Sequence, residues 1–429
     1  MTLSAAIHDA AVAVPPWREG TGAARVAVHA PDEDSLTLAW QAGRALLDRH
    51  ARTRIAALLL ATTTAPVTDG GNASVLADAL RLDTEGLLVQ EYGGGLSASG
   101  AALATAAALV AAGVAPVLVL LADTRRRHGG RAFGSGAAAL LVTADGPVRL
   151  HLMGADADST REVYALGGGT VDAEPGFTRW LASRAAAGAA EPGIHTVTVR
   201  PGSPGLPGIG HLGCAAAWAE AVALLNRDGN GGGDGGADPD PASETRVQLD
   251  IGGGARYRLR LDFAPGYRPD PGPLGLTAAD TDTHAAAPPG LAPIDGFDPF
   301  TSVAQAWRDR REELRLTGMW CAACEAPEYP AAPACPRHGP AADLRPHEMA
   351  RTGRVLSRTR DHVFPVGGPL TTAVVRLDGG GRFYGQVAAG HDASIGDEVE
   401  LVLRRIATAP GAAPRYFWKI LPVTDGTGR

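Results

Sequence analysis

Three cysteines and one histidine have the spacing of metal ligands: Cys321, Cys324, Cys335 and His338. Each Cys-x-x-Cys or Cys-x-x-His pair makes a short knuckle that directs two ligands at one point. Zinc accepts tetrahedral coordination by three thiolates and one imidazole, and four protein ligands leave no position for water. The pattern therefore predicts structural zinc without metal catalysis. His347 is an alternative fourth ligand with poorer spacing, and a reduced cysteine pair beside an incidental histidine is the other interpretation.

The composition limits the class of protein. A chain of 429 residues favours two or three domains, and 45% apolar with 20% charged residues is typical of a folded soluble protein. The net charge of -7 argues against a general nucleic-acid binder, which needs a basic face. Metal-ligand spacing argues against a disulfide framework. The N-terminal residues lack a basic region and a clear cleavage site, so we expect a cytoplasmic protein without a signal peptide.

Strand-like and helix-like segments alternate in the first 145 residues. Residues 35–50 have apolar positions at helical spacing, and residues 74–82 form a second predicted helix. Between them, IAALLLATTT (55–64) is a continuous apolar run that suits a strand buried on both faces. This alternation predicts a mostly parallel sheet flanked by helices.

One uncharged stretch, residues 101–122, is long enough to cross a bilayer. Gly113 and Pro116 divide it into an alanine-rich segment and the strand-like sequence VLVLLA. A buried helix followed by a buried strand accounts for this pattern, so we expect no membrane span.

A weak internal repeat follows. FGSGAAALLVTADG (133–146) is a glycine turn leading into a strand, and IGGGARYRLRLDF (251–263) is a similar segment. Between them, residues 195–201 suit a strand and residues 215–225 suit a helix. The pattern favours two similar α/β halves packed together.

The rest of the chain changes in composition. Residues 228–243 are rich in Gly, Asp and Pro and suit a surface loop, and residues 303–316 suit a charged helix before the cysteine cluster. Short strands with turn signals follow and predict a small antiparallel barrel. The predicted divisions are 1–265 for an α/β domain, 266–298 for a linker, 299–350 for the helix with the zinc site, and 351–425 for the barrel.

The order of five N-terminal motifs resembles the thiolase superfamily, nearest to 3-ketoacyl synthase III and HMG-CoA synthase. The motifs are EDSLTLAWQAGRALL, IAALLLATTTAP, GGLSASGAALATAAALVAAG, LLADTR and GSGAAALLV. The resemblance covers residues 1–265 and implies a duplicated αβαβα fold. In that family a cysteine at the start of the buried helix is acylated from CoA or a carrier protein, because a helix N-terminus stabilises a thiolate. A histidine and an asparagine from the second half complete the site.

This sequence departs from the family pattern at all three positions. The nucleophile position falls on Leu96, the histidine position on Arg200, and the asparagine position on His211. A leucine cannot carry an acyl group. No cysteine precedes Cys214, so no small shift of the alignment restores the usual nucleophile.

Other residues could replace the missing nucleophile. Cys214 follows His211 by three residues at the start of a predicted helix, and Ser97 and Ser99 lie beside Leu96. A Cys214–His211 pair or one of these serines would form a rewired site. The alternative is that Cys214 is a small buried residue, as free cysteines commonly are.

The C-terminal part resembles the zinc-ribbon/OB-fold proteins that accompany thiolase-like enzymes. The resemblance rests on the helix, the cysteine cluster, the TGRV turn at 352–355 and the ending IGDEVEL…YFWKILP. It implies a module that helps to build a CoA-binding channel. OB folds also bind oligonucleotides, but Phe383 and Tyr384 lie here without a dense basic stripe. We therefore expect no nucleic-acid partner.

Together these features predict a non-catalytic thiolase-fold subunit fused to a zinc-ribbon/OB domain. Its expected partner is a thiolase-like subunit with an intact Cys-His-Asn set, in a dimer or hetero-oligomer that acts on acyl-CoA or acyl carrier protein thioesters. Two alternatives stay open, an acyltransferase with a rewired site around His211 and Cys214, and a scaffold for thioester cargo. A CoA thioester is the expected ligand.

Overall fold

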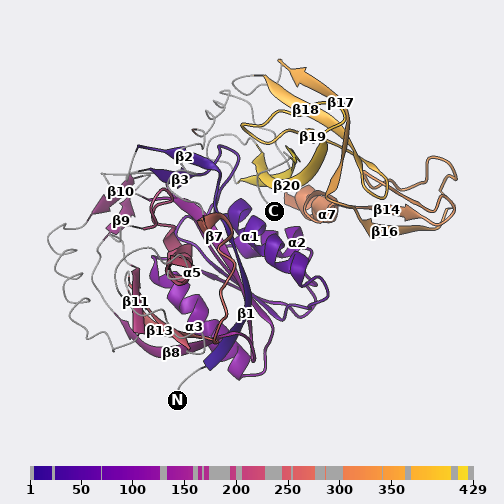
Figure 1. Ribbon diagram of the computed structural model, residues 1–429. Helices are drawn as coiled ribbons and strands as arrows, with labels where there is room; N and C mark the ends of the chain where they lie inside the picture. Colours follow the sequence, from indigo (N-terminus) through magenta and orange to yellow (C-terminus); the bar gives the residue numbers. More distant parts are fainter. Residues whose placement is uncertain are drawn as a thin grey trace. The chain divides into compact units, whose positions relative to one another are not determined.

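The computed structural model in Figure 1 describes residues 4–21, 25–68, 70–125, 133–157, 163–166, 169–172, 194–199, 205–227, 244–252, 255–275, 286, 303–340, 342–362, 369–406 and 414–423. Arg200 and the predicted loop at 228–243 lie outside the described residues. Most of the predicted linker at 266–298 also lies outside them, although it includes the described 3-10 turn η3 (Gly272–Gly275).

The chain divides into two compact units. The N-terminal unit comprises Met1–His29, Asp34–Leu76 and Leu82–Ala286, and the C-terminal unit comprises Ala30–Glu33, Ala77–Arg81 and Ala287–Arg429. Two short segments from the early chain thus belong to the second unit, which the sequence did not indicate. The predicted domain limits stay predictions.

A nine-stranded mixed sheet forms the N-terminal unit, in the order β11-β12-β13-β8-β1-β7-β6-β4-β5. The predicted mostly parallel sheet is wrong, because five of the eight neighbouring strand pairs are antiparallel and three are parallel. Its strands are β1 (Ser4–Ala13), β4 (Ala57–Ala61), β5 (Leu88–Tyr92), β6 (Val117–Thr124), β7 (Ser135–Thr143), β8 (Val148–Ala157), β11 (Ile194–Val199), β12 (Thr245–Ile251) and β13 (Ala255–Phe263). Its described residues also form two small antiparallel pairs, β2 (Trp17–Glu19) with β3 (Val26–Val28) and β9 (Val163–Leu166) with β10 (Gly169–Asp172).

The two halves of the large sheet have matching strand order. In the first half β4 runs parallel to β6, and β6, β7 and β1 then pair antiparallel. In the second half β11 runs parallel to β12. There β12 pairs antiparallel with β13, and β13 pairs antiparallel with β8, which is the same order of pairings as in the first half. The two predicted repeat segments are β7 and β13, which hold equivalent positions. This agrees with the predicted duplication, but β1 also pairs with β8, so both halves share one continuous sheet.

Helix α1 (Ser35–Arg49) begins at a capping box and matches the predicted helix at 35–50. The Asp34 Oδ1 atom accepts hydrogen bonds from the Leu36 and Thr37 backbone N–H groups at 3.0 and 3.1 Å. In return, the Asp34 N–H donates to the Thr37 hydroxyl at 2.8 Å. These bonds satisfy N–H groups that have no partner within the first turn of a helix.

Helix α3 (Ser97–Ala111) consists of small and aliphatic residues and packs on strands of both halves, including β1, β6 and β13. The approach to β13 is close, because a Cβ atom added at Gly100 would lie 2.6 Å from the Tyr257 Cβ atom. The helix ends before β6 begins, which confirms the predicted division of residues 101–122. In the described part of the chain, no helix has the length and apolar character needed to span a membrane.

Two further helices lie in the described part of the first 230 residues. Helix α2 (Asn72–Ala79) begins two residues before and ends three residues before the helix predicted at 74–82. Helix α5 (Ala216–Arg227) follows directly on the 3-10 turn η2 (Gly213–Ala215), close to the prediction of 215–225. This turn brings His211 and Cys214 to the start of α5.

The C-terminal unit begins with α7 (Val303–Glu313), which ends three residues before the predicted limit. A small sheet in the order β15-β14-β16 follows, and then a five-stranded sheet in the order β19-β18-β17-β20-β21. These strands are β14 (Thr317–Cys321), β15 (Ala326–Glu328), β16 (Leu344–Glu348), β17 (Thr352–Asp361), β18 (Leu370–Leu377), β19 (Arg382–Gln386), β20 (Glu398–Ile406) and β21 (Arg415–Pro422).

The five-stranded sheet is nearly closed. A parallel bridge joins Val387 to Ile420, and the Ala388 N–H donates to the Ile420 carbonyl at 2.9 Å, which connects the end of β19 to β21. Phe383 and Trp418 are fully buried in its core. This arrangement is compatible with the predicted OB fold.

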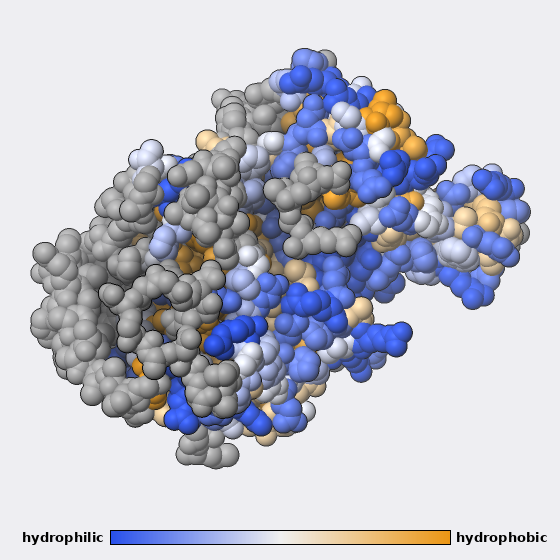
Figure 2. All heavy atoms as spheres, viewed as in Figure 1, coloured by the Kyte–Doolittle hydropathy of each residue, from blue (hydrophilic) through white to orange (hydrophobic). Residues whose placement is uncertain are grey.

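The surface carries apolar side chains in separate places. On the face in Figure 2, hydrophilic residues dominate the coloured surface and apolar residues appear in small groups. Among the described residues, the exposed large apolar side chains are Leu88, Val89, Met153, Trp307, Leu356, Tyr384, Ile395 and Val423. Leu88 and Val89 are adjacent on β5, the last strand of the large sheet.

Candidate functional site

The four predicted metal ligands lie together in the C-terminal unit. The Sγ atoms of Cys321, Cys324 and Cys335 and a ring nitrogen of His338 all lie within 4.8 Å of one another. Cys321 ends β14, and Cys324 lies in the turn before β15. In the second knuckle, the Gly339 N–H donates to the Cys335 carbonyl at 2.8 Å and so closes the turn that holds His338.

The separations fit a tetrahedral zinc ion. The Nδ1 atom of His338 lies 3.8, 3.3 and 3.5 Å from the sulfurs of Cys321, Cys324 and Cys335, and the last two sulfurs are 3.5 Å apart. Ordinary Zn–S and Zn–N bonds at tetrahedral angles place ligand atoms about 3.5–3.8 Å apart. The alternative ligand, His347, instead lies with its ring 5.5 Å from that of Trp320.

Leu96, the predicted nucleophile position, lies at the start of α3 and carries a hydrocarbon side chain. Leu96 directly precedes the helix, is 2% exposed and makes no side-chain capping bond. The nearby Ser99 hydroxyl is buried and donates to the Leu96 carbonyl at 2.8 Å. Neither side chain is arranged as an activated nucleophile, because Leu96 has no reactive atom and the Ser99 proton is held by a carbonyl.

His211 is a buried, neutral imidazole at the start of the second buried helix. The Gly213 N–H donates to its Nδ1 atom at 3.1 Å, so the ring proton resides on Nε2. That Nε2 atom has no hydrogen-bond partner among the described residues. Burial, and secondarily the Arg125 charge, lower the pKa of His211 to about 4. The ring is therefore uncharged near neutral pH.

Cys214 lies near the start of α3. Burial, and after it the Asp123 carboxylate, raise the pKa of this thiol well above the ordinary value. The Arg125 charge and a hydrogen bond from the Ser99 N–H to the sulfur lower the pKa by less. The side chain is 0% exposed, so the thiol is neutral and enclosed. In the described structure no hydrogen bond joins Cys214 to the His211 ring.

Asp123 is a buried carboxylate that the sequence did not single out. It lies in β6, and its Oδ1 atom accepts from the Thr63 N–H at 2.7 Å and from the hydroxyls of Thr62, Thr63 and Thr64. Its Oδ2 atom accepts from the Cys214 N–H at 2.8 Å. The start of η2 and α5 is thus occupied by the protein's own anion, where an external anion would otherwise be stabilised.

The signals for Asp123 were present but separated in the sequence. An acidic residue at the end of the apolar run VLVLLAD and three threonines after another apolar run are each unusual for buried strands. Only the fold brings them together. Arg200, the third predicted position, lies outside the described residues.

Comparison with known proteins supports the fold. No protein-family model and no curated protein sequence matches the chain. Among solved structures, the HMG synthase of the curacin biosynthetic pathway has a TM-score of 0.53 at 13% identity, over 66% of this chain and 85% of that one. The same enzyme in complex with holo donor-ACP has a TM-score of 0.52 at 12% identity, covering 72% and 88%. An HMG-CoA synthase complexed with CoA has a TM-score of 0.50 at 12% identity, covering 68% and 95%.

These likenesses, at low sequence identity, show a thiolase-like fold of the HMG-CoA synthase kind. They concern the fold alone. The zinc-ribbon and OB assignments of the C-terminal unit stay predictions, supported by the Cys/His cluster and the nearly closed sheet.

Proposed function

We propose that this chain is a non-catalytic thiolase-fold subunit, fused to a zinc-ribbon/OB domain, that supports a partner condensing enzyme acting on acyl thioesters. One observation carries the proposal. Leu96 lies at the start of the buried helix where a thiolate would be needed, and a hydrocarbon cannot accept an acyl group.

The thioester class rests on the structural relatives. One is described in complex with CoA and another in complex with holo donor-ACP. A subunit of the same fold is suited to contact the same kinds of carrier. We therefore infer that the donor of the complex is held on CoA or on an acyl carrier protein, while the partner subunit supplies Cys, His and Asn.

The zinc ion would have a structural role in this assignment. Cys321, Cys324, Cys335 and His338 would hold it with all four tetrahedral positions filled by the protein. When bound, zinc would cross-link the two knuckles around the β14–β15 turn.

The edge strand β5 suits contact with a partner subunit. It pairs with β4 on one side, and Leu88 and Val89 are 42% and 37% exposed. An unprotected edge strand can accept a strand from another chain through backbone hydrogen bonds. This edge is our candidate for the subunit interface.

The competing function is a rewired acyltransferase that uses Cys214. The contact between its sulfur and the Ser99 N–H favours this reading, because a helix N-terminus can stabilise a thiolate. Complete burial and the raised pKa oppose it.

Intact-protein mass spectrometry after incubation with acetyl-CoA separates the two functions. We expect no adduct on Cys214, Ser97 or Ser99, in wild type or in a Cys214→Ser control. An acetyl adduct that disappears in Cys214→Ser would establish the rewired site and remove the non-catalytic assignment.

Affinity purification of the full chain from its native host tests the partner. We expect a second thiolase-like protein with an intact Cys-His-Asn set, and acyl transfer by the pair that depends on the cysteine of the partner. Purification of the chain alone, with thioester binding but without such a protein, would favour the scaffold alternative.

A further inference from the structure

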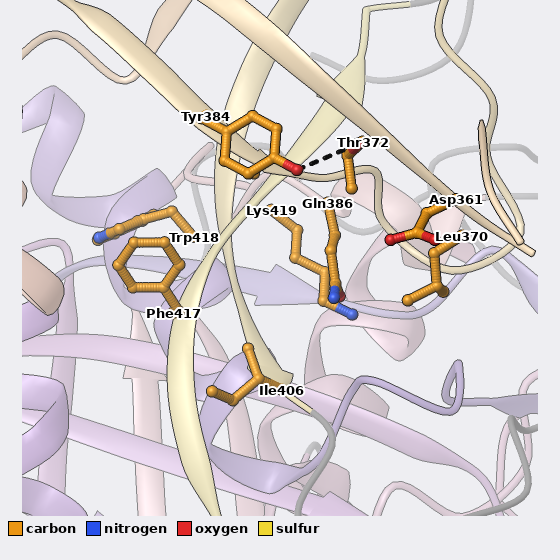
Figure 3. A pocket seen from close by; sticks show the side chains of 10 residues that line it. Asp361, Leu370, Thr372, Tyr384, Gln386, Ile406, Phe417, Trp418 and Lys419 are labelled. Atoms are coloured by element: carbon orange, nitrogen blue, oxygen red, sulfur yellow. Dashed lines mark hydrogen bonds between the residues drawn. The ribbon is translucent and has the colours of Figure 1, made fainter. Parts of the chain in front are cut away.

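A cavity lies in the five-stranded sheet of the C-terminal unit, among β17, β18, β19, β20 and β21. It has a volume of about 190 Å³. Figure 3 shows the side chains that line it, which combine aromatic, aliphatic and hydrogen-bonding groups. An apolar cavity of about 150 Å³ accommodates benzene, so this larger cavity has room for one small planar ring system.

Aromatic residues form part of the lining. Phe417 is held by stacking, since its ring centroid lies 5.8 Å from that of Phe383, which in turn lies 6.2 Å from that of Tyr329. Tyr384 is 66% exposed, and its hydroxyl donates to Thr372 at 3.5 Å (Figure 3). A ring bound here would gain aromatic contact from Phe417, which is fixed, and from Tyr384, which is accessible.

Gln386 gives the cavity hydrogen-bonding specificity. Its side chain lines the cavity, and within the described residues its amide has no hydrogen-bond partner. A primary amide presents a donor and an acceptor next to each other. It therefore pairs best with a ligand edge that carries an acceptor beside a donor, as adenine does.

Two charged residues line the cavity, Asp361 and Lys419, and both already interact with other groups of the protein. Lys419, the only lysine of the chain, places its Nζ atom 2.9 Å from Asp32 Oδ2. The neighbouring Arg404 lies 2.9 Å from a Glu33 oxygen and 3.9 Å from Asp32 Oδ1. Two cations thus face two carboxylates, all largely buried, and Lys419 is not available for an anionic ligand.

We propose that this cavity binds a neutral, planar nitrogen heterocycle that carries a donor beside an acceptor, in contact with Tyr384 and Phe417 and recognised by Gln386. The site goes beyond the proposed function, because it requires neither a thioester nor a partner subunit. The ring size follows from the volume and the aromatic contact from the lining. Neutrality follows because both charged lining residues, Lys419 and Asp361, already interact within the protein.

Calorimetry on the full chain, with adenosine as the probe, tests the site. Two further probes serve as comparisons. Toluene lacks the hydrogen-bonding edge, and ATP adds negative charge to adenosine. We expect adenosine to bind at least tenfold more tightly than toluene, because the Gln386 amide is left unpaired by toluene. ATP should bind no more tightly than adenosine. No binding of adenosine at millimolar concentration, equal binding of toluene, or much tighter, salt-dependent binding of ATP would each overturn the proposal.

Three variants locate the binding. Gln386→Leu removes the amide at similar volume and should weaken adenosine about tenfold without weakening toluene. Tyr384→Ala should weaken both rings about tenfold, the magnitude typical of a lost aromatic contact with a base. Ile395→Ala is the control, since Ile395 is 68% exposed and does not line the cavity. Unchanged adenosine affinity in Gln386→Leu, with thermal unfolding like wild type, would exclude the assigned recognition.

Discussion

At the scale of single residues, the start of α5 is organised by Asp123 and His211. The carboxylate accepts hydrogen bonds from the threonines after β4 and from the Cys214 N–H, and the imidazole accepts from the Gly213 N–H. The sequence identified His211 and Cys214 from a family pattern, but it gave Asp123 no role. Its partners lie 60 and 91 residues away, so no local pattern could connect them.

His211 should make the protein sensitive to acid. Its pKa is about 4 in the folded protein, below the ordinary value of 6.5. The unfolded chain therefore binds a proton between these pH values that the folded protein does not bind. The free energy of unfolding is therefore unaffected by this ring above pH 6.5. It falls by about 3 kcal/mol as the pH is lowered from 6.5 to 4.

Urea denaturation at several pH values between 4 and 7 measures this loss. The variant His211→Asn should show a shallower decline than wild type, because it lacks the titrating ring. Parallel declines in the two proteins would contradict the buried neutral imidazole.

At the scale of elements, periodicity predicted most of the helices and strands near the site. The helix at 35–50, the division of 101–122 and the strands in the two repeat segments all occur. Helix ends were less accurate, since α2 and α7 end three residues early. Pairing was not predictable, because the β1–β8 contact that joins the two halves depends on the whole chain.

At the scale of elements, the variant Gly213→Ala tests how the buried turn η2 packs against Asp123. The φ of Gly213 is +57°, and an added Cβ atom would lie 2.0 Å from Asp123 Oδ2. Gly213→Ala should therefore lower the free energy of unfolding by about 2–4 kcal/mol, from backbone strain and from the clash.

Gly86→Ala is the matched control. Gly86 also has a positive φ, +73°, but an added Cβ atom would meet nothing within 4 Å. We expect a loss of about 1 kcal/mol from strain alone. Equal losses in the two variants, measured by chemical denaturation, would show that Asp123 is not packed against η2 as described.

At the scale of the whole molecule, zinc content is the clearest prediction. Purified protein should contain about one zinc per chain by elemental analysis, as a site with four protein ligands implies. Cys321→Ser should abolish zinc binding and make the cluster region sensitive to protease, because metal binding and folding are coupled in such sites.

Cys214→Ser is the matched control, since it removes the one cysteine outside the cluster. It should retain zinc at the wild-type level. Wild-type protein without zinc after gentle purification, or zinc retained in Cys321→Ser, would contradict the assignment.

The sequence located the metal ligands at this scale but not the make-up of the second unit. Cysteine spacing is local, so 18 residues were enough to predict the cluster. The inclusion of Ala30–Glu33 in the C-terminal unit depends on contacts with residues far along the chain, such as the Asp32–Lys419 ion pair.

That ion pair also determines how the surface of this protein can be labelled. The chain has one lysine, and it is 7% exposed and bound to a carboxylate. Amine-reactive cross-linkers and affinity tags would therefore find almost no side-chain target on the folded subunit. A map of its contacts with a partner would have to use carboxylate-directed or light-activated reagents, for which the described surface offers many sites.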